Sequence, residues 1–421
     1  MNYNSLRDDS SRGIFLVALI IVVFIPPLLF YIGLASSMAE GTLIAVIAVI
    51  SLLLTTGRGT LPVFSKALGW AIVILITIAF HSLVVRLKMP FDFYRASLSL
   101  CLFQILFLGS LGLSHLLSES SDSSIHSSVR YIFCIFIILA IGNLLGITPT
   151  APVGVTYAKP FFPYTEPSFL ALVLIPLLLF QVVVSSGKKR LLLISFSFVA
   201  SFSLQSLTLL IGSIVISIIC LNPISIALVT PVLYILNPLF NLEYYTDRFI
   251  FSGGTQNLST LVYMQGWQLV ADGFLKSYGW GIGFQQLGVH ETKTTAGITI
   301  VTLVGNDVNI LDGGFTAAKV LSEFGILGGL LLIGYFFTAF RAFTFLRRAL
   351  SRPTNYPAAL IFTNSIVIGY GIELMIRGSG YFTGTGLLYL ASLVYLYSGR
   401  GKQNMGLRKI ALDSRGATNP S

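Results

Sequence analysis

Charged residues are scarce in this chain. Only 10% of its 421 residues are Asp, Glu, Lys or Arg, whereas 55% are apolar. Soluble domains carry about 25% charged residues, so this composition excludes a soluble protein. No long polar block interrupts the apolar sequence, which excludes a receptor ectodomain or an appended cytosolic ATPase. Any chemistry must therefore belong to membrane-spanning helices and the loops between them.

Motifs for metal and nucleotide chemistry are also missing. The chain has no GxxxxGK[ST], HExxH, CxxC or GxSxG pattern and no acidic pair at metal-ligand spacing. Cys101, Cys134 and Cys220 each lie alone in an apolar run, so we expect small buried side chains without disulfides. These absences argue against ATP hydrolysis, zinc proteolysis and Rossmann redox chemistry, and we expect no metal and no cofactor.

Long apolar runs predict an all-α polytopic membrane protein with about 12 spans, since a transmembrane helix needs about 20 apolar residues. The turn at Gln205 and Ser206 allows two short helices or one kinked helix, so the count is about 11 or 12. The predicted spans are 14–35, 41–56, 67–86, 96–115, 130–148, 167–186, 191–204, 206–221, 224–240, 321–345, 357–376 and 380–398.

The basic residues predict the orientation. With an even number of spans and a cytoplasmic amino terminus, nine of the 26 basic residues fall outside and the other 17 inside. This satisfies the positive-inside rule, so we expect both termini in the cytoplasm and no nucleic-acid partner behind the net charge of +10. The nine outer basic residues are explained either by ordinary scatter of basic residues across the membrane or by binding of an anionic ligand, and as a set they favour the ligand. They are Arg86, Lys88, Arg95, Lys159, Arg248, Lys276, Lys293, Lys319 and Arg377.

Only one connection is long. Residues 241–320 form an outer loop between the ninth and tenth spans of a single membrane domain, and structureless loops beyond about 15 residues are usually functional or disordered. Trp267, Trp280 and the apolar stretch 298–304 favour a loop that folds against the membrane body. The spacing at 264–274 predicts an amphipathic helix on the bilayer surface.

Several charged residues fall at the outer ends of spans. Glu373 and Arg377 are four residues apart, which predicts that they share a helix face and pair, and Lys319 and Glu323 open the tenth span with the same spacing. Charges inside a bilayer are functional candidates by default, although an ion pair that only fixes helix packing is the alternative. Glu166, just before Pro167, also fits an ordinary helix start.

Three pieces of sequence carry a family resemblance. The first is 162–171, where Glu166-Pro167-Ser168 opens a mid-chain span, and the second is the Ser/Thr-containing break at 202–210. The third is the outer loop, which contains Arg248, Trp267 and a glycine-rich segment at 279–283 and ends at 322–329, where the next span begins. In this order they resemble the bacterial O-antigen polymerase (Wzy) family, within the group that includes the O-antigen ligases.

Two positions depart from the patterns of that group. Gln205 stands where the family often has an arginine. The ligases of the group carry a histidine shortly before the Glu-x-Gly-Ile pattern, where this chain has Asp312-Gly313-Gly314. The one histidine of the outer loop, His290, lies well upstream, which favours polymerase over ligase.

The resemblance implies a metal-independent glycosyltransferase at the periplasmic face of the bacterial inner membrane, in lipopolysaccharide or other polysaccharide biosynthesis. Such an enzyme moves a growing glycan from undecaprenyl pyrophosphate onto a new lipid-linked repeat unit. Its partners would be the undecaprenyl-pyrophosphate-linked oligosaccharide and the bilayer, with a chain-length regulator and a flippase as candidate protein partners.

This chemistry needs cations for the pyrophosphate and a general base for the acceptor hydroxyl. We expect Arg248 to contact pyrophosphate or glycan, although a solvated arginine or one paired with Asp247 or Glu243 is the alternative. Arg86 and Arg95 can also be explained as helix anchors that snorkel. The further expected anion contacts are Arg86, Arg95, Arg377 and Lys319, and the candidate bases are Glu166 first, then Asp312, Glu323 and His290.

Two other functions remain open. An O-antigen ligase acting on lipid A core is the nearest enzymatic alternative. A flippase or transporter of lipid-linked oligosaccharides would also have about 12 spans and charged residues in a cavity, but it should show internal repeats, and none is found in the sequence.

Overall fold

The computed structural model describes residues 3–56, 61–147, 149, 161–221, 243–251, 255–289, 294–305, 313–378 and 380–398. Within these ranges the chain is helical and forms no β-strand, which confirms the all-α prediction. The helices are α1 (Tyr3–Tyr31), α2 (Met38–Thr55), α3 (Leu61–Arg86), α4 (Phe93–Glu119), α5 (Asp122–Leu144), α6 (Pro167–Val184), α7 (Gly187–Ser203), α8 (Leu207–Cys220), α10 (Glu243–Thr246), α11 (Leu258–Ser277), α12 (Thr295–Val304), α13 (Thr316–Ala349), α14 (Ala358–Met375) and α15 (Gly384–Tyr397).

Helices occur at eleven of the predicted spans. Eight of them, α1 to α6, α13 and α14, contain a stretch long and apolar enough to cross a membrane, so the chain is a multi-pass membrane protein. The shorter α7, α8 and α15 account for three more. The spans at 191–204 and 206–221 are two helices, separated at Gln205, whose φ is +46°. The predicted ninth span, 224–240, lies outside the described residues.

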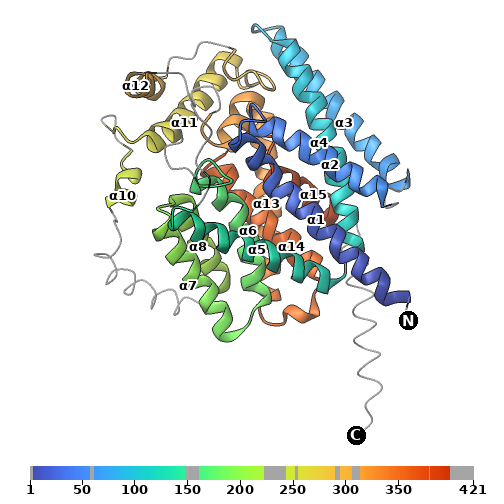
Figure 1. The fold of residues 1–421 in the computed structure, drawn as a ribbon. Helices are drawn as coiled ribbons and strands as arrows, with labels where there is room; N and C mark the ends of the chain where they lie inside the picture. Colours follow the sequence, from blue (N-terminus) through green and yellow to red (C-terminus); the bar gives the residue numbers. More distant parts are fainter. Residues whose placement is uncertain are drawn as a thin grey trace.

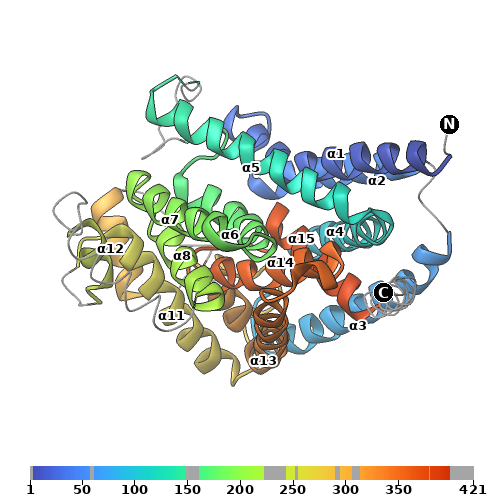
Figure 2. The same ribbon diagram turned by 90° about the horizontal axis from the view of Figure 1, so that it is seen from below.

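Helices α6 and α14 form the centre of the bundle (Figure 2). Of their spanning stretches, 83% and 78% of the residues are buried, against 22% in peripheral α3. The exposed apolar side chains of α3, among them Trp70 and Phe80, therefore face the lipid of a bilayer. The three cysteines are free, but Cys101 and Cys134 are exposed on their helices, so the expectation that all three are buried was wrong.

At one end of the bundle, at the bottom of Figure 1, arginine side chains join neighbouring helices by donating hydrogen bonds to backbone carbonyls. Arg190 donates to the carbonyl oxygens of Ser185 at 2.7 Å and Leu350 at 3.1 Å, and Arg347 donates to Ile218 at 2.9 Å. Carbonyls at helix carboxyl ends lack partners within the helix, and cations bind there favourably. These arginines belong to the set that the sequence assigns to the cytoplasm.

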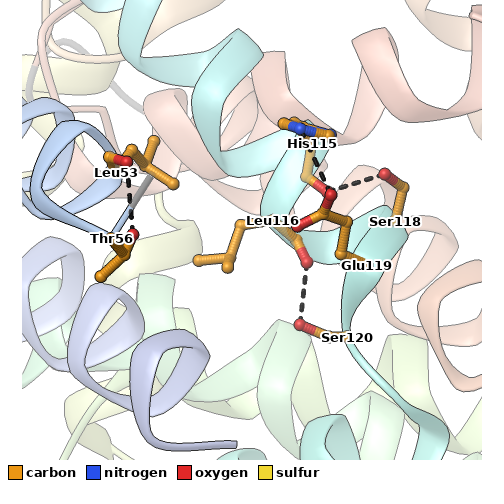
Figure 3. A network of polar contacts seen from close by, with 7 residues as sticks. All are labelled: Leu53, Thr56, His115, Leu116, Ser118, Glu119 and Ser120. Carbon is orange, nitrogen blue, oxygen red and sulfur yellow. Dashed lines mark hydrogen bonds and ion pairs between the residues drawn. The ribbon is translucent and has the colours of Figure 1, made fainter. Parts of the chain in front are cut away.

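The carboxyl ends of α2 and α4 lie near each other and are closed in a similar way (Figure 3). In α4, the hydroxyls of Ser118 and Ser120 donate to the carbonyls of His115 and Leu116 at 2.7 and 2.8 Å. Glu119 lies 3.5 Å from the His115 ring. Side chains close in sequence thus donate hydrogen bonds to carbonyl oxygens of the last helical turn, which lack partners within the helix.

Helix α13 is broken at Gly325, whose φ of +55° and ψ of −127° are not helical. The glycine-rich segment 279–283 of the outer loop lies against this break. Three backbone hydrogen bonds of 2.9 Å join the two, from Ile282 N to Ser322 O, from Gly283 N to Glu323 O and from Ile326 N to Gly279 O.

Only glycine fits on both sides of this contact. A Cβ atom on Gly325 would lie 2.1 Å from the Gly279 carbonyl oxygen, and one on Gly281 would lie 2.4 Å from that of Glu323. Both glycines have positive φ, where other L-residues are strained. The two backbones therefore approach closely because neither carries a side chain at the contact.

We predict that Gly325→Ala destabilises the protein by at least about 1–2 kcal/mol, because left-handed backbone strain adds to a clash with a carbonyl. The matched control is Gly329→Ala in the same helix, where a Cβ would meet nothing within 4 Å. Thermal unfolding of the two purified variants in detergent would measure the difference. Equal melting temperatures would show that the break does not depend on glycine.

Candidate functional site

An ion pair between Glu166 and Arg377 lies where α6 begins and α14 has just ended. Glu166 occupies the cap position before Pro167, but its side chain caps no helix N–H. Its carboxylate instead pairs with the Arg377 guanidinium and accepts a hydrogen bond of 3.0 Å from the Ser168 hydroxyl. The ordinary helix start thus explains the position of Glu166 but not the role of its side chain.

The predicted pairing of Glu373 with Arg377 was wrong. Helix α14 ends at Met375, so Arg377 lies beyond it and the two residues do not share a helix face. The Arg377 guanidinium instead lies 5.1 Å from the centre of the Phe169 ring, next to Glu166. Glu373 is buried inside the bundle and accepts hydrogen bonds from other groups.

A second arginine, Arg248, is held by the outer loop. Its guanidinium lies 4.0 Å from the centre of the Tyr244 ring, one helical turn before it. Its carbonyl accepts a hydrogen bond of 3.1 Å from Thr260 at the start of α11. Burial raises the pKa of the Tyr244 hydroxyl, an effect that Arg248 opposes and Glu166 increases. Tyr244 therefore lies within electrostatic reach of both the arginine and the ion pair.

Each arginine has one guanidinium nitrogen without a partner. The Nε atoms of Arg248 and Arg377 are buried without a hydrogen-bond partner in the structure. The side chains of Arg377 and Glu166 are 22% and 38% exposed, so a ligand can reach the pair. Guanidinium groups with free, fixed donors bind phosphate and carboxylate groups, often through two parallel hydrogen bonds. The arrangement can hold an anion beside a carboxylate.

Lys319 and Glu323 form a second cluster in the first half of α13, and both side chains are buried. The Tyr381 hydroxyl donates to Glu323 Oε2 at 2.8 Å, and the Lys319 ammonium lies 5.3 Å from the centre of the Tyr381 ring. Glu323 thereby fastens the α14–α15 link to α13.

The link between α14 and α15 connects the two clusters. It starts with Ile376 and Arg377, and a Cβ on Gly378 would lie 2.3 Å from the Thr316 hydroxyl. A Cβ atom on Gly380 would lie 3.9 Å from the Lys319 ammonium. Tyr381, the next residue, binds Glu323 through its hydroxyl. The link therefore runs over the start of α13, with the exposed ion pair at one end and the buried cluster at the other.

The remaining predicted residues fall elsewhere. At the α3–α4 hairpin, Arg86 lies 4.4 Å from the centre of the Phe93 ring, and the Arg95 N–H donates to Asp92. Within the described residues, neither arginine contacts Glu166, Arg248 or Arg377. His290 and Asp312 lie outside the described residues.

The sequence analysis missed several contacting residues. Tyr244, one turn before Arg248, could have been found from its spacing, whereas Tyr381 and Phe169 carry no such signal. Gln286 was also missed, although it fixes the loop by accepting from Asp92 N at 2.8 Å and donating to Asp92 O at 3.1 Å. No group of three His, Cys, Asp or Glu that could hold a metal occurs among the described residues.

Comparison with protein-family models, curated proteins and solved structures finds no match to this chain.

We predict that Tyr381→Phe lowers the stability of the protein by about 1–3 kcal/mol, because it leaves an oxygen of buried Glu323 without its donor. Tyr278→Phe is the control, since Tyr278 is 82% exposed and keeps its ring over Lys88 in this variant. Melting temperatures of the two variants test this. If Tyr381→Phe and Tyr278→Phe have the same melting temperature, the hydrogen bond between Tyr381 and Glu323 does not hold the link in place.

Proposed function

We propose that this protein is a polysaccharide polymerase of the O-antigen type, acting at the periplasmic face of a bacterial inner membrane. The observation that supports it most is the pairing of an exposed carboxylate with an arginine from a distant segment at one end of the bundle. Glu166 and Arg377 pair, and Tyr244 under Arg248 lies within reach of Glu166. Each of these charged residues was expected at the site from the sequence.

The proposed reaction joins an acceptor sugar to a glycan carried on undecaprenyl pyrophosphate. The acceptor hydroxyl attacks the anomeric carbon of the donor glycan, and the bond from that carbon to the pyrophosphate oxygen breaks. Arg248 and Arg377, whose side chains are partly exposed, neutralise the leaving pyrophosphate by charge-assisted hydrogen bonds. Glu166 accepts the proton of the hydroxyl as general base.

The ion pair gives this mechanism an order. While Arg377 holds the Glu166 carboxylate, the carboxylate oxygen that binds the guanidinium is not available to a substrate hydroxyl. A pyrophosphate that binds Arg377 displaces the carboxylate and frees it to accept the proton of the hydroxyl. The base therefore becomes active only when the donor substrate is bound.

One observation favours a second candidate. Broken helices such as α13 are typical of secondary transporters, in which the break lines a substrate path. A flippase of lipid-linked oligosaccharides would have this feature, and a ligase would share the arginines. The glycans of a deletion strain separate the three functions.

For a polymerase, the deletion strain should carry a single repeat unit on its lipid A core, with no ladder of longer chains. Bare core with polymer left on undecaprenyl pyrophosphate would indicate a ligase. Bare core with single repeats trapped on the cytoplasmic face would indicate a transporter. Extraction and gel electrophoresis of the surface and lipid-linked glycans give the answer.

We predict that Arg248→Ala and Arg377→Gln, expressed in that strain, reduce polymer at least about 100-fold, because charge stabilisation in the transition state is lost. Arg248→Lys should not fully restore it, since an ammonium cannot replace a bidentate guanidinium. The control is Lys276→Gln, which removes a loop cation already paired with Asp272 at 2.7 Å. A normal ladder from Arg248→Ala at normal protein level would remove Arg248 from the site.

A further inference from the structure

Three aromatic side chains of the outer loop lie next to one another, close to Arg248 in the sequence. Phe251 follows Arg248 by three residues, and Tyr263 and Trp267 are four residues apart in α11. The centre of the Tyr263 ring lies 6.0 Å from that of Phe251 and 6.4 Å from that of Trp267. Phe251 is 54% exposed and Trp267 is 42% exposed, so a ligand can reach these rings. Phe251, Tyr263 and Trp267 are called the aromatic platform below.

Phe315, directly before α13, supports the platform from the buried side and is 1% exposed. The Tyr263 ring stacks on the Phe315 ring, with 4.7 Å between their centres and 23° between their planes. The Trp267 ring centre lies 5.4 Å from that of Phe315. Aromatic side chains have few rotatable bonds, so rings packed in this way offer a contact surface at a low cost in conformational entropy.

Helix α12 packs on another side of α11 and does not cover the platform. Leu261 belongs to a buried cluster with residues of α12, and the Gln268 side chain accepts a hydrogen bond of 3.0 Å from Ala296 N. With 3.6 residues per turn, Leu261 and Gln268 lie on the side of α11 opposite to Tyr263 and Trp267. Helices α11 and α12 lie side by side at the upper left of Figure 1.

The platform contacts the segments that carry both arginines of the candidate site. The carbonyl of Arg248 accepts a hydrogen bond of 3.1 Å from Thr260, at the start of α11. On the other side, a Cβ atom on Gly378 would lie 3.1 Å from the carbonyl carbon of Phe315, and Gly378 directly follows Arg377. The rings are therefore fixed to both arginine-bearing segments by short contacts.

We propose that the aromatic platform binds a sugar ring of the glycan substrate by stacking. This inference rests on the proposed function, in which the glycan is bonded directly to the pyrophosphate that the arginines hold. The weakly positive C–H groups on one face of a pyranose pack against the electron-rich face of an aromatic ring. The Tyr263 hydroxyl and the Trp267 indole N–H are polar groups that can also bind sugar hydroxyls.

The bilayer is the other occupant to consider, because tryptophan and tyrosine are common at membrane interfaces. The nearby α12 exposes aliphatic side chains, such as Ile298 and Leu303, which suit contact with lipid. The platform instead consists of aromatic rings and adjoins two arginine-bearing segments. This combination suits a ligand that has both an apolar ring face and an anionic group, as a pyrophosphate-linked sugar does.

The test uses the repeat-unit oligosaccharide prepared from the surface polysaccharide of the source strain, without lipid or pyrophosphate. Calorimetric titration of the purified full chain in detergent should show saturable binding. Trp267→Leu should weaken the affinity at least about 5-fold because an aromatic contact is lost, and Trp267→Phe should keep most of it. The control is Tyr94→Leu, which removes an exposed aromatic ring at the start of α4 and should leave the affinity unchanged.

The fluorescence of Trp267 shows where the oligosaccharide binds. The chain has three tryptophans, so replacing Trp70 and Trp280 by Phe leaves Trp267 as the one indole. Both replacements should preserve the fold, since Trp70 faces lipid and Trp280 binds His81 through its backbone carbonyl. Added oligosaccharide should change this fluorescence saturably. In liposomes, quenching by brominated lipid without a response to oligosaccharide would show that the bilayer covers the platform and would overturn the proposal.

These measurements fail separately from the proposed polymerase. Oligosaccharide binding that requires Trp267, together with no ladder from the reconstituted protein, would support the platform and reject the polymerase. A ladder from the reconstituted protein, with Trp267→Leu binding oligosaccharide as tightly as Tyr94→Leu, would support the polymerase and reject the platform. No saturable binding of oligosaccharide to the wild type would also reject the platform.

Discussion

A chain inside a bilayer must satisfy its backbone hydrogen bonds from its own groups, and the end of this bundle that carries the Glu166–Arg377 pair depends on how the break in α13 meets that requirement. At Gly325 the regular hydrogen bonds of the helix are interrupted. The glycine-rich segment 279–283 donates N–H groups to carbonyls of α13 and accepts a hydrogen bond from Ile326 N in return. The contact works only because Gly281 and Gly325 let the two backbones touch. A loop far away in the sequence is thereby anchored inside the helix bundle.

The neighbouring features follow from that anchor. The anchored loop is held from the other side by His81, whose ring nitrogen lies 2.8 Å from the Trp280 carbonyl. Glu323, next to the break, binds Tyr381 on the α14–α15 link. The link in turn places Arg377 against Glu166. A series of contacts thus runs from a backbone break to an exposed ion pair, and a change at the break would move the arginine.

Much of the fold could be predicted from the sequence because apolar runs of spanning length have few alternatives in a membrane. Eleven predicted spans coincide with helices, and the ambiguous turn at Gln205 proved to separate two of them. Arg190 and Arg347, which the sequence assigns to the same side, lie at one end of the bundle, and Glu166 and Arg377 meet at the other. Which end faces the cytoplasm stays a prediction from the sequence.

The site was less predictable, for two physical reasons. Spacing rules assume a continuous helix, and Glu373 and Arg377 did not pair because α14 ends between them. Contacts across a bundle leave no local signal, so the partner of Arg377, 211 residues away, could not be inferred. Individual residue types at span ends were nevertheless informative, because charges are rare there and each one needs a partner or a ligand.

The most direct test of the proposed polymerase is reconstitution of the purified protein in liposomes with undecaprenyl-pyrophosphate-linked repeat units and a metal chelator. A polymerase should produce a ladder of longer lipid-linked glycans and release undecaprenyl pyrophosphate without any other protein. Movement of single repeat units across the bilayer with no ladder would contradict the proposal, as would transfer that occurs only when lipid A core is supplied as acceptor.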